Sequence, residues 1–282
     1  MDLIAVNYPS DDSDSDCDER ELSLETKLAP IPVEIIEKYK LEPNTSKYET
    51  MSLVGLRSVP QRWCTFLYYE WRPNRVERAQ LMQIVTRIND FCQKGSIKLT
   101  RQLHFEPLCL SSLGAPLSLH ISLSQLIVFE READRELLYD KLRERLRTET
   151  RLGPFTMKFE PRLKLMPSFA KDTLFLVLPV NAALKSKEMV CINTIIQQAI
   201  AETFPGKSSN EVQALTCMPA TTHMSIGLAA NVPKSVLENL NFISTLLPME
   251  LQDTETFQFQ VTSLKFDKNR QILSIPFARV IL

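Results

Sequence analysis

The sequence offers few of the residues that build a disulfide framework, a zinc centre or a membrane span. Its six cysteines are scattered with no CxxC pair, which is typical of reduced thiols in a core and excludes the usual disulfide and zinc patterns. No apolar run approaches the roughly 18 residues of a transmembrane helix. The N-terminus is acidic, whereas a secretory signal is basic and apolar, so we expect an intracellular protein with no membrane partner.

Beyond residue 47 the chain has no net negative charge, because the excess of acidic residues is confined to the N-terminal segment. Residues 1–47 carry twelve acidic and five basic residues, a net of −7, whereas the other 235 residues carry 22 and 28, a net of +6. Like charges at this density repel and cannot be buried. The composition therefore predicts a disordered acidic tail over 1–47 and a single, mildly basic folded domain over 48–282.

The folded domain shows the same order of expected elements twice: strand, helix, strand, helix, then closing strands. In the first half these are strand 63–71, helix 73–93, strand 117–128, helix 130–147 and two short strands within 155–166. In the second half they are strand 173–180, helix 183–204, strand 222–228, helix 233–247 and further strands towards the C-terminus. This repeat predicts two interleaved lobes of about 60–166 and 173–282.

Histidine is scarce, and two of the three histidines have the same context. His120 lies in LSLHISLSQLIVF, 117–129, and His223 in THMSIGL, 222–228, so each begins a His-x-Ser motif. Because side chains alternate along a strand, His120 shares a face with Ser122, and His223 shares a face with Ser225. The opposite faces are apolar and suit a core.

Two further small residues are expected to extend the polar faces. Ser124 follows Ser122, and Gly227 follows Ser225, at the same alternate spacing. Small side chains there would keep the surface low, as a cleft for a ligand requires.

This residue set suits acid–base chemistry on a phosphodiester. A histidine and a serine two positions apart lie about 6–7 Å apart along a strand, so both can reach one phosphate. Histidine titrates near neutral pH, so one imidazole can accept a proton while the other donates one, and the hydroxyls can stabilise the phosphate oxygens. Three alternatives remain: ordinary surface histidines, a metal site without an obvious third ligand, and a serine nucleophile without the usual sharp turn.

The paired motifs and their flanks carry a family resemblance. HIS and HMS on the strands of two similar halves resemble the 2H phosphoesterase superfamily. HISLSQLIVF, followed by a charged helix and then by FTMKFEPRLKLM and DTLFLVLPV, is similar to the U6 snRNA phosphodiesterase family, in particular its fungal-type members. The likeness runs from about Val59 to Leu282.

The resemblance implies an α+β fold of two pseudo-twofold-related lobes, each with an antiparallel sheet that carries a His-x-Ser strand, flanking helices and a cleft between the lobes. It implies a metal-independent 3′→5′ RNA exonuclease, without a cofactor, that trims the oligouridine tail of U6 snRNA and leaves a 2′,3′-cyclic phosphate, which some members then open. His223 would be the general base, His120 the general acid, and Ser122 and Ser225 would hold the phosphate. The family role implies a nuclear monomer.

Other functions and one departure stay open at this point. A 2H cyclic phosphodiesterase would act on small or tRNA-derived cyclic phosphates, and a non-catalytic scaffold would only bind RNA. Animal members of the family have an aromatic residue before the second motif, whereas LTCMPATTH, 215–223, has none. Phe105, Tyr139 and Phe169 are candidates to replace it. Lys158, Arg162 and Lys164 either contact phosphates or form an exposed strand face.

Overall fold

Antiparallel strands form the centre of the fold. The computed structural model describes residues 63–95, 98–168, 172–252, 256–268 and 271–278. Within these ranges a nine-stranded sheet has the order β11-β10-β1-β3-β8-β7-β6, with β2 paired to β8 and β4 to β1, and β5 pairs with β9 in a second sheet. The strands are β1 (Trp63–Trp71), β2 (Glu106–Pro107), β3 (Leu119–Ser122), β4 (Ile127–Phe129), β5 (Phe155–Lys158), β6 (Lys164–Pro167), β7 (Leu174–Pro179), β8 (His223–Ala229), β9 (Gln258–Val261), β10 (Ser263–Lys268) and β11 (Gln271–Pro276).

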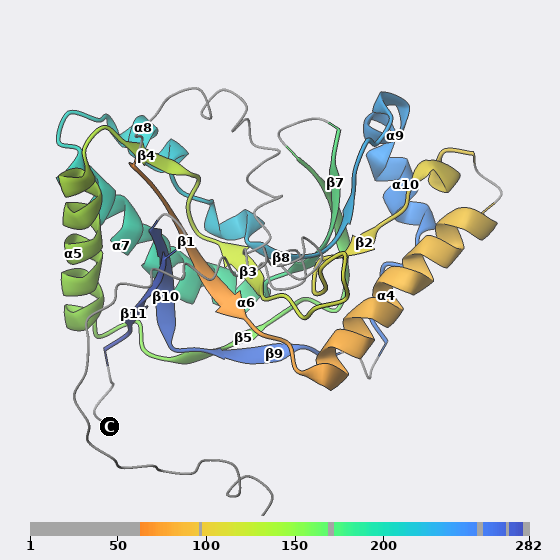
Figure 1. Ribbon diagram of the computed structural model, residues 1–282, viewed down its shortest axis with the longest axis horizontal. Helices are drawn as coiled ribbons and strands as arrows, with labels where there is room; N and C mark the ends of the chain where they lie inside the picture. The colour runs from red at the N-terminus through yellow and green to blue at the C-terminus, as the bar shows by residue number, and fades with distance from the viewer. Residues whose placement is uncertain (1–62, 96–97, 169–171, 253–255, 269–270, 279–282) are drawn as a thin grey trace, which may run out of the picture. The chain divides into compact units, whose positions relative to one another are not determined.

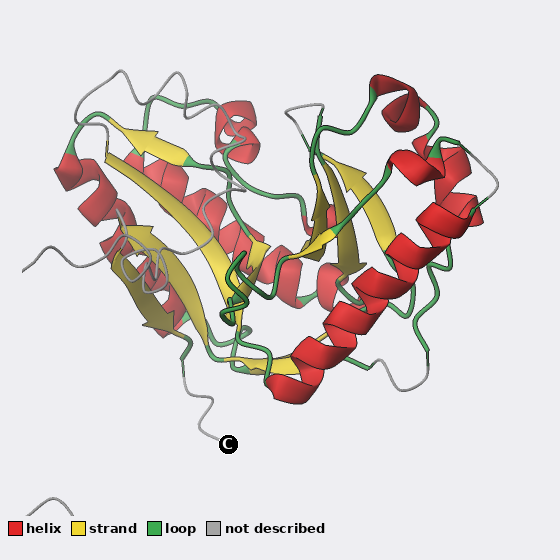
Figure 2. Cartoon of the chain, turned by 45° about the vertical axis from the view of Figure 1, so that its right-hand side comes forward, coloured by secondary structure: helices red, strands yellow, loops and turns green. Residues whose placement is uncertain are grey.

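Helices pack against both halves of the nine-stranded sheet. The α-helices are α4 (Arg75–Lys94), α5 (Glu132–Thr148), α6 (Ala182–Ser186), α7 (Glu188–Thr203), α8 (Ser209–Ala214), α9 (Lys234–Glu238) and α10 (Leu240–Leu246). Two short 3₁₀ helices are η1 (Thr100–Gln102) and η2 (Pro219–Thr221). Helices α5 and α7 pack side by side, and α5 covers β1, β4 and β11, whereas α4 covers β2 and β8 (Figure 1). Figure 2 shows these two groups of helices at opposite ends of the sheet.

The chain crosses between the two halves of the sheet. Strand β1, from the start of the described chain, pairs with β10 from its end, through Tyr68 and Lys265. Helix α4 follows β1 in sequence, yet it packs against β8 from the second half of the sequence. The two halves of the sheet are therefore each built from both halves of the sequence.

The observed fold confirms the expected α+β class with antiparallel strands. It corrects the expectation of one sheet per lobe, because β3 and β8 pair directly and make the sheet continuous. The expected helix 183–204 is two helices that meet at Lys187, and the expected helix 233–247 is two helices that meet at Asn239. The expected strands within 155–166 are present but do not pair with each other, since β5 pairs with β9 and β6 with β7.

One apolar core joins these elements. It contains alternate residues of the central strands, such as Leu67 and Tyr69 of β1, together with the inner faces of α4, α5 and α7. In the part of the chain that the structure describes, no helix combines the length and hydropathy needed to cross a membrane. The expected tail, 1–47, lies outside the described residues, and its boundary stays a prediction.

Candidate active site

The two His-x-Ser motifs lie side by side at the centre of the sheet. Strand β3 carries the first motif, strand β8 carries the second, and Ile121 pairs with Met224 in antiparallel register. This register sets His120 opposite Ser225 and Ser122 opposite His223. Directly opposed side chains have Cβ atoms about 4.5–5.5 Å apart, and diagonal neighbours such as the two histidines about 7–8 Å.

Alternation along β3 explains how the sequence builds one half of this arrangement. Leu119 and Ile121 are 2% and 0% exposed and belong to the core, whereas His120 and Ser122 are partly exposed on the opposite face. The apolar side chains fix the face on which the motif lies, because a slip of one residue would bury the histidine and expose the core.

Ser124 does not extend this polar face, contrary to expectation. Strand β3 ends at Ser122, and Ser124 is buried, where its Oγ accepts a hydrogen bond from the backbone N–H of Leu67 at 2.9 Å. The end of the strand breaks the alternation, so Ser124 has a structural contact with β1.

Gly227 also differs from the expectation, because a bulge interrupts the second strand. Ser225 pairs with Val177 of β7, but Gly227 pairs with Leu176, so Ile226 is the extra residue in β8. The extra residue moves Gly227 to the core face. A Cβ on Gly227 would lie 3.4 Å from the side chains of both Leu176 and Phe105. The glycine therefore permits close packing in the core and does not lower the cleft.

Strand β1 adds side chains beside the first motif that the sequence analysis did not identify. Tyr68 pairs with Ser122, and Glu70 pairs with His120. The ring centroids of Tyr68 and Phe66 lie 5.6 and 5.9 Å from that of His120, both in edge geometry. Burial, followed by the charges of Asp267 and Glu70, raises the pKa of Tyr68, so its hydroxyl is neutral near pH 7.

Glu70 is held as a carboxylate in a polar network. Arg72 Nε donates to Glu70 Oε1 at 3.0 Å, and Lys265 Nζ lies 3.6 Å from Oε2 and donates to Ser274 Oγ at 2.7 Å. Burial alone would raise the pKa of Glu70, but hydrogen bonds from Arg72 and Ser118 and the charges of Arg72 and Lys265 outweigh it and lower the pKa.

Backbone contacts orient the second histidine. His223 Nδ1 lies 2.8 Å from the carbonyl oxygen of Thr221. Because a carbonyl oxygen can only accept, this contact assigns the hydrogen to Nδ1 and makes Nε2 the acceptor nitrogen of a neutral ring. The preceding helix η2 and the Thr222 carbonyl, which accepts from Val180 N–H at 3.1 Å, hold this turn in place.

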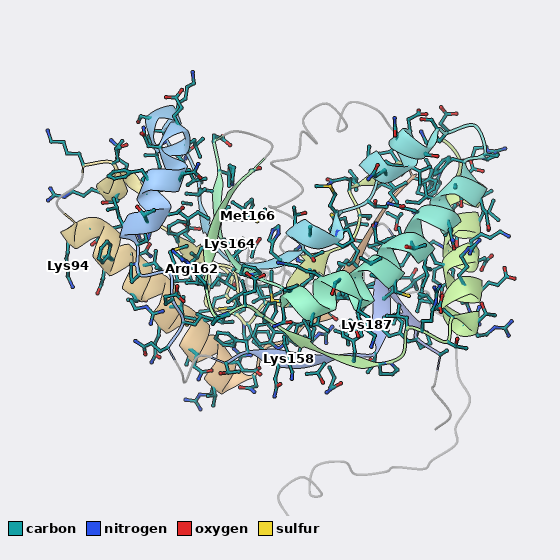
Figure 3. The ribbon with its side chains drawn as sticks, turned by 180° about the vertical axis from the view of Figure 1, so that it is seen from behind. Lys94, Lys158, Arg162, Lys164, Met166 and Lys187 are labelled. Atoms are coloured by element: carbon teal, nitrogen blue, oxygen red, sulfur yellow. The ribbon has the colours of Figure 1, made fainter. Side chains whose placement is uncertain are left out.

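Of the three basic residues singled out beforehand, Lys164 shares the face of the motifs. It pairs with Val177, which in turn pairs with Ser225, so the three side chains lie in one row. Arg162 makes an ion pair with Glu250 at 3.5 Å, and Lys158 belongs to β5 in the second sheet. Figure 3 shows Lys164 and Met166 on β6, Arg162 just before that strand, and Lys158 apart from them.

A cavity of about 510 Å³ lies beside the chain segment that leads into the second motif. Its wall includes Pro219 of η2 and the amide side chains of Asn193, Gln197 and Gln213. None of the four motif residues lines it, so we assign no chemical step to this cavity.

Two further sets of residues are the aromatic candidates for base stacking and the possible metal ligands. Phe105 is buried in the core, and the Tyr139 ring packs edge-on against Phe266, with centroids 5.3 Å apart. Phe169 lies outside the described residues. Among the described residues, no three His, Cys, Asp or Glu side chains gather closely enough to hold a metal ion.

The sequence did contain a signal for the β1 residues, because alternation in WCTFLYYEW puts Phe66, Tyr68 and Glu70 on one face.

Comparisons with known proteins agree with this fold. A family model for HVSL, an uncharacterised conserved protein, matches residues 29–276. The solved structure of Kluyveromyces marxianus Usb1 with uridine monophosphate is similar, with a TM-score of 0.62 and 18% identity over 76% of this chain and 98% of that chain. A second structure of Kluyveromyces marxianus Usb1 gives 0.59 and 16% over the same shares. No curated protein matches the chain. The chain therefore belongs to the HVSL family and has the Usb1 fold.

Proposed function

We propose that this chain is a 2H phosphoesterase that acts as a metal-independent 3′→5′ exonuclease on RNA and trims the oligouridine tail of U6 snRNA. The observation that carries the proposal is the register of β3 and β8, which opposes the histidine of each motif to the serine of the other. The solved Usb1 structure with uridine monophosphate supports a nucleotide ligand for a protein of this fold.

In this proposal a pseudo-twofold axis passes between Ile121 and Met224 and relates two lobes. Exchange of the motifs also exchanges their flanking strands, so Tyr68 beside Ser122 corresponds to Val177 beside Ser225. One strand further out, Lys265 and Lys164 correspond in the same way. The symmetry thus gives each serine a lysine two strands away, which suits an anionic ligand between them.

His223 is the general base of the reaction. The carbonyl of Thr221 holds hydrogen on Nδ1, so Nε2 accepts the proton of a ribose 2′-hydroxyl. The 2′-oxygen then attacks the adjacent phosphorus. The diagonal separation of about 7–8 Å between the histidine positions leaves room for one phosphate between the rings.

His120 is the general acid. As the 2′-oxygen forms its bond to phosphorus, the bond to the 5′-oxygen breaks, and His120 donates its proton to that leaving oxygen. Ser122 and Ser225 donate hydrogen bonds to the non-bridging oxygens, where negative charge accumulates in the transition state. One proton enters the protein at His223 and one leaves it at His120. The pair returns to its starting state when His223 releases a proton to solvent and His120 takes one up.

The first product is RNA with a 2′,3′-cyclic phosphate. The product either keeps this cyclic phosphate or is opened with the histidine roles exchanged: His120 then deprotonates water, the water opens the ring, and His223 protonates the departing ribose oxygen. The substrate partner is the 3′ end of U6 snRNA, the site of action is the nucleus, and the chain acts as a monomer without a cofactor.

The test uses a synthetic RNA that ends in several uridines, incubated with the purified protein in EDTA. Mass spectrometry reads both the length of the RNA and its end group. We expect shortening by wild-type protein in EDTA and a fall of at least about 10²-fold in rate for His120→Ala and for His223→Ala, since each removes a proton carrier. His104→Ala is the matched control because it removes the one histidine outside the motifs.

An intact RNA after incubation with wild-type protein would contradict the exonuclease. A small 2′,3′-cyclic nucleotide then distinguishes the alternatives. If it is opened, the protein is a cyclic phosphodiesterase, and if it is bound without conversion, the protein is a scaffold that has kept the fold.

A further inference from the structure

We propose that Glu70 is a positioning residue that makes His120, and not His223, the proton donor, because its carboxylate favours the protonated form of the imidazole beside it. The inference rests on the proposed function, which needs one charged and one neutral histidine. Two chemically identical rings in symmetry-related positions do not provide that difference by themselves, so their surroundings have to provide it.

The strand register places a carboxylate directly beside one histidine. Glu70 of β1 is the cross-strand partner of His120 of β3, a pair whose Cβ atoms lie about 4.5–5.5 Å apart. The Glu70 side chain is only 10% exposed, so solvent weakens its field less than that of a surface carboxylate. Its lowered pKa keeps it ionised over the pH range in which imidazole titrates.

The corresponding position beside the other histidine has no charge. His223 pairs with Pro179 of β7. One carboxylate on that side is Glu160, whose backbone N–H donates to the Pro179 carbonyl, so it lies beyond β7. Glu160 is also paired with both Lys185, at 2.8 Å, and Lys164, at 3.4 Å. The two histidines thus differ in their first neighbour, a carboxylate for one and an apolar ring for the other.

The other ionisable groups around His120 do not remove this difference. From β8 its direct neighbour is the uncharged Ser225, with His223 on the diagonal. From β1 the neutral Tyr68 contributes an aromatic edge. Lys265 and Asp267 are on β10, one strand beyond β1, and carry opposite charges. Arg72 is two residues beyond Glu70, with a side chain 76% exposed, so water screens much of its charge.

The network also explains why Glu70 stays in place. Arg72, Lys265 and Ser118 fix its carboxylate, and Ser118 directly precedes β3, two residues before His120. A carboxylate that is fixed before the reaction needs no reorganisation when the proton leaves His120. Lys265 competes with the imidazolium for the same carboxylate, so its removal should strengthen the effect of Glu70 on His120.

The direct test is an NMR titration of the free protein with labelled histidine rings. The chain has only three histidines, so His104→Ala, His120→Ala and His223→Ala assign every ring signal. We expect Glu70→Gln to move the titration midpoint of His120 to lower pH by about one unit, the lower end of the range for an opposite charge at this separation. Glu160→Gln is the matched control, since it removes a carboxylate that is also held by two cations, and it should leave the His120 midpoint unchanged.

Kinetics on the uridine-tailed RNA give the second test. The acid must be protonated, so activity is lost as pH rises through its titration, and Glu70→Gln should move this alkaline limb down by the same unit while the acidic limb stays. Lys265→Met should move it up, and Glu70→Asp should restore part of the wild-type profile.

An unchanged His120 midpoint in Glu70→Gln, or equal shifts of both histidines, would overturn the inference. A wild-type protein that cleaves no RNA would overturn the proposed function instead. The NMR result is read without substrate, so the two failures are distinguishable.

Discussion

Ser124 and Ser122 are two positions apart, but their side chains have different partners. The buried Oγ of Ser124 accepts the Leu67 N–H, so Ser124→Ala leaves a buried donor without its partner. We expect a loss of about 1–3 kcal/mol in the free energy of unfolding, measured by urea denaturation. The rate per folded molecule should stay at the wild-type value. A large loss of activity with normal stability would instead assign Ser124 to the site.

Ser122 should show the reverse pattern. It is partly exposed at the end of β3, opposite His223, and its removal leaves no described backbone group unpaired. For Ser122→Ala we expect a fall in kcat of about 10²-fold, typical for the loss of one donor to a developing negative charge, and a change in stability below about 0.5 kcal/mol. Equal activity of Ser122→Ala and wild-type protein would remove this hydroxyl from the proposed mechanism.

Single residues also show how far the sequence alone could lead. Period-two alternation predicted that His120 shares a face with Ser122 and His223 with Ser225, and the register of β3 and β8 then sets the two motifs opposite each other. Alternation failed at Ser124, where the strand ends, and Gly227, which follows a bulge. Neither event leaves a signal in a hydrophobic pattern, since both are determined by contacts with other strands.

At the scale of elements, the start of α4 provides a test. Asn74 Oδ1 accepts from the N–H groups of Val76 and Glu77, and Glu77 Oε2 accepts from the Asn74 N–H, which completes a capping box. Asn74→Ala removes the first half of this box and should lower the free energy of unfolding by about 1 kcal/mol. Asn74→Asp keeps the acceptor and should lose little. Equal losses in the two variants would show that the cap contributes nothing.

The same scale shows which elements a pattern can predict. Long amphipathic helices such as α4 and α5 were expected nearly at their observed limits, because an apolar stripe is a local feature of the sequence. The breaks at Lys187 and Asn239 were missed. Lys187 has φ −118° and ψ −79°, and Asn239 has φ −105° and ψ 19°, so each departs from regular helical geometry within a continuous apolar pattern.

At the scale of the whole domain, strand pairing was beyond the sequence pattern. The repeat of elements predicted two interleaved lobes but not which strands pair: β1 pairs with β10 about 200 residues later, and α4 packs against β8. Alternation shows which face of a strand is buried but not which strand lies next to it. For this reason Tyr68 and Glu70 could not be linked to His120 until the register was known.

This interleaving predicts that the described domain unfolds as one unit. The only two tryptophans of the chain, Trp63 and Trp71, both lie on β1, so fluorescence follows the centre of one half of the sheet. Far-UV circular dichroism follows the helices, which cover both halves. Because β1 depends on β10 and β3 on β8, neither half can lose its strands without exposing the other, and we expect the two urea transitions to coincide. A fluorescence midpoint clearly separated from the dichroism midpoint would show instead that the halves fold independently, and the single continuous sheet would then not be the cooperative unit.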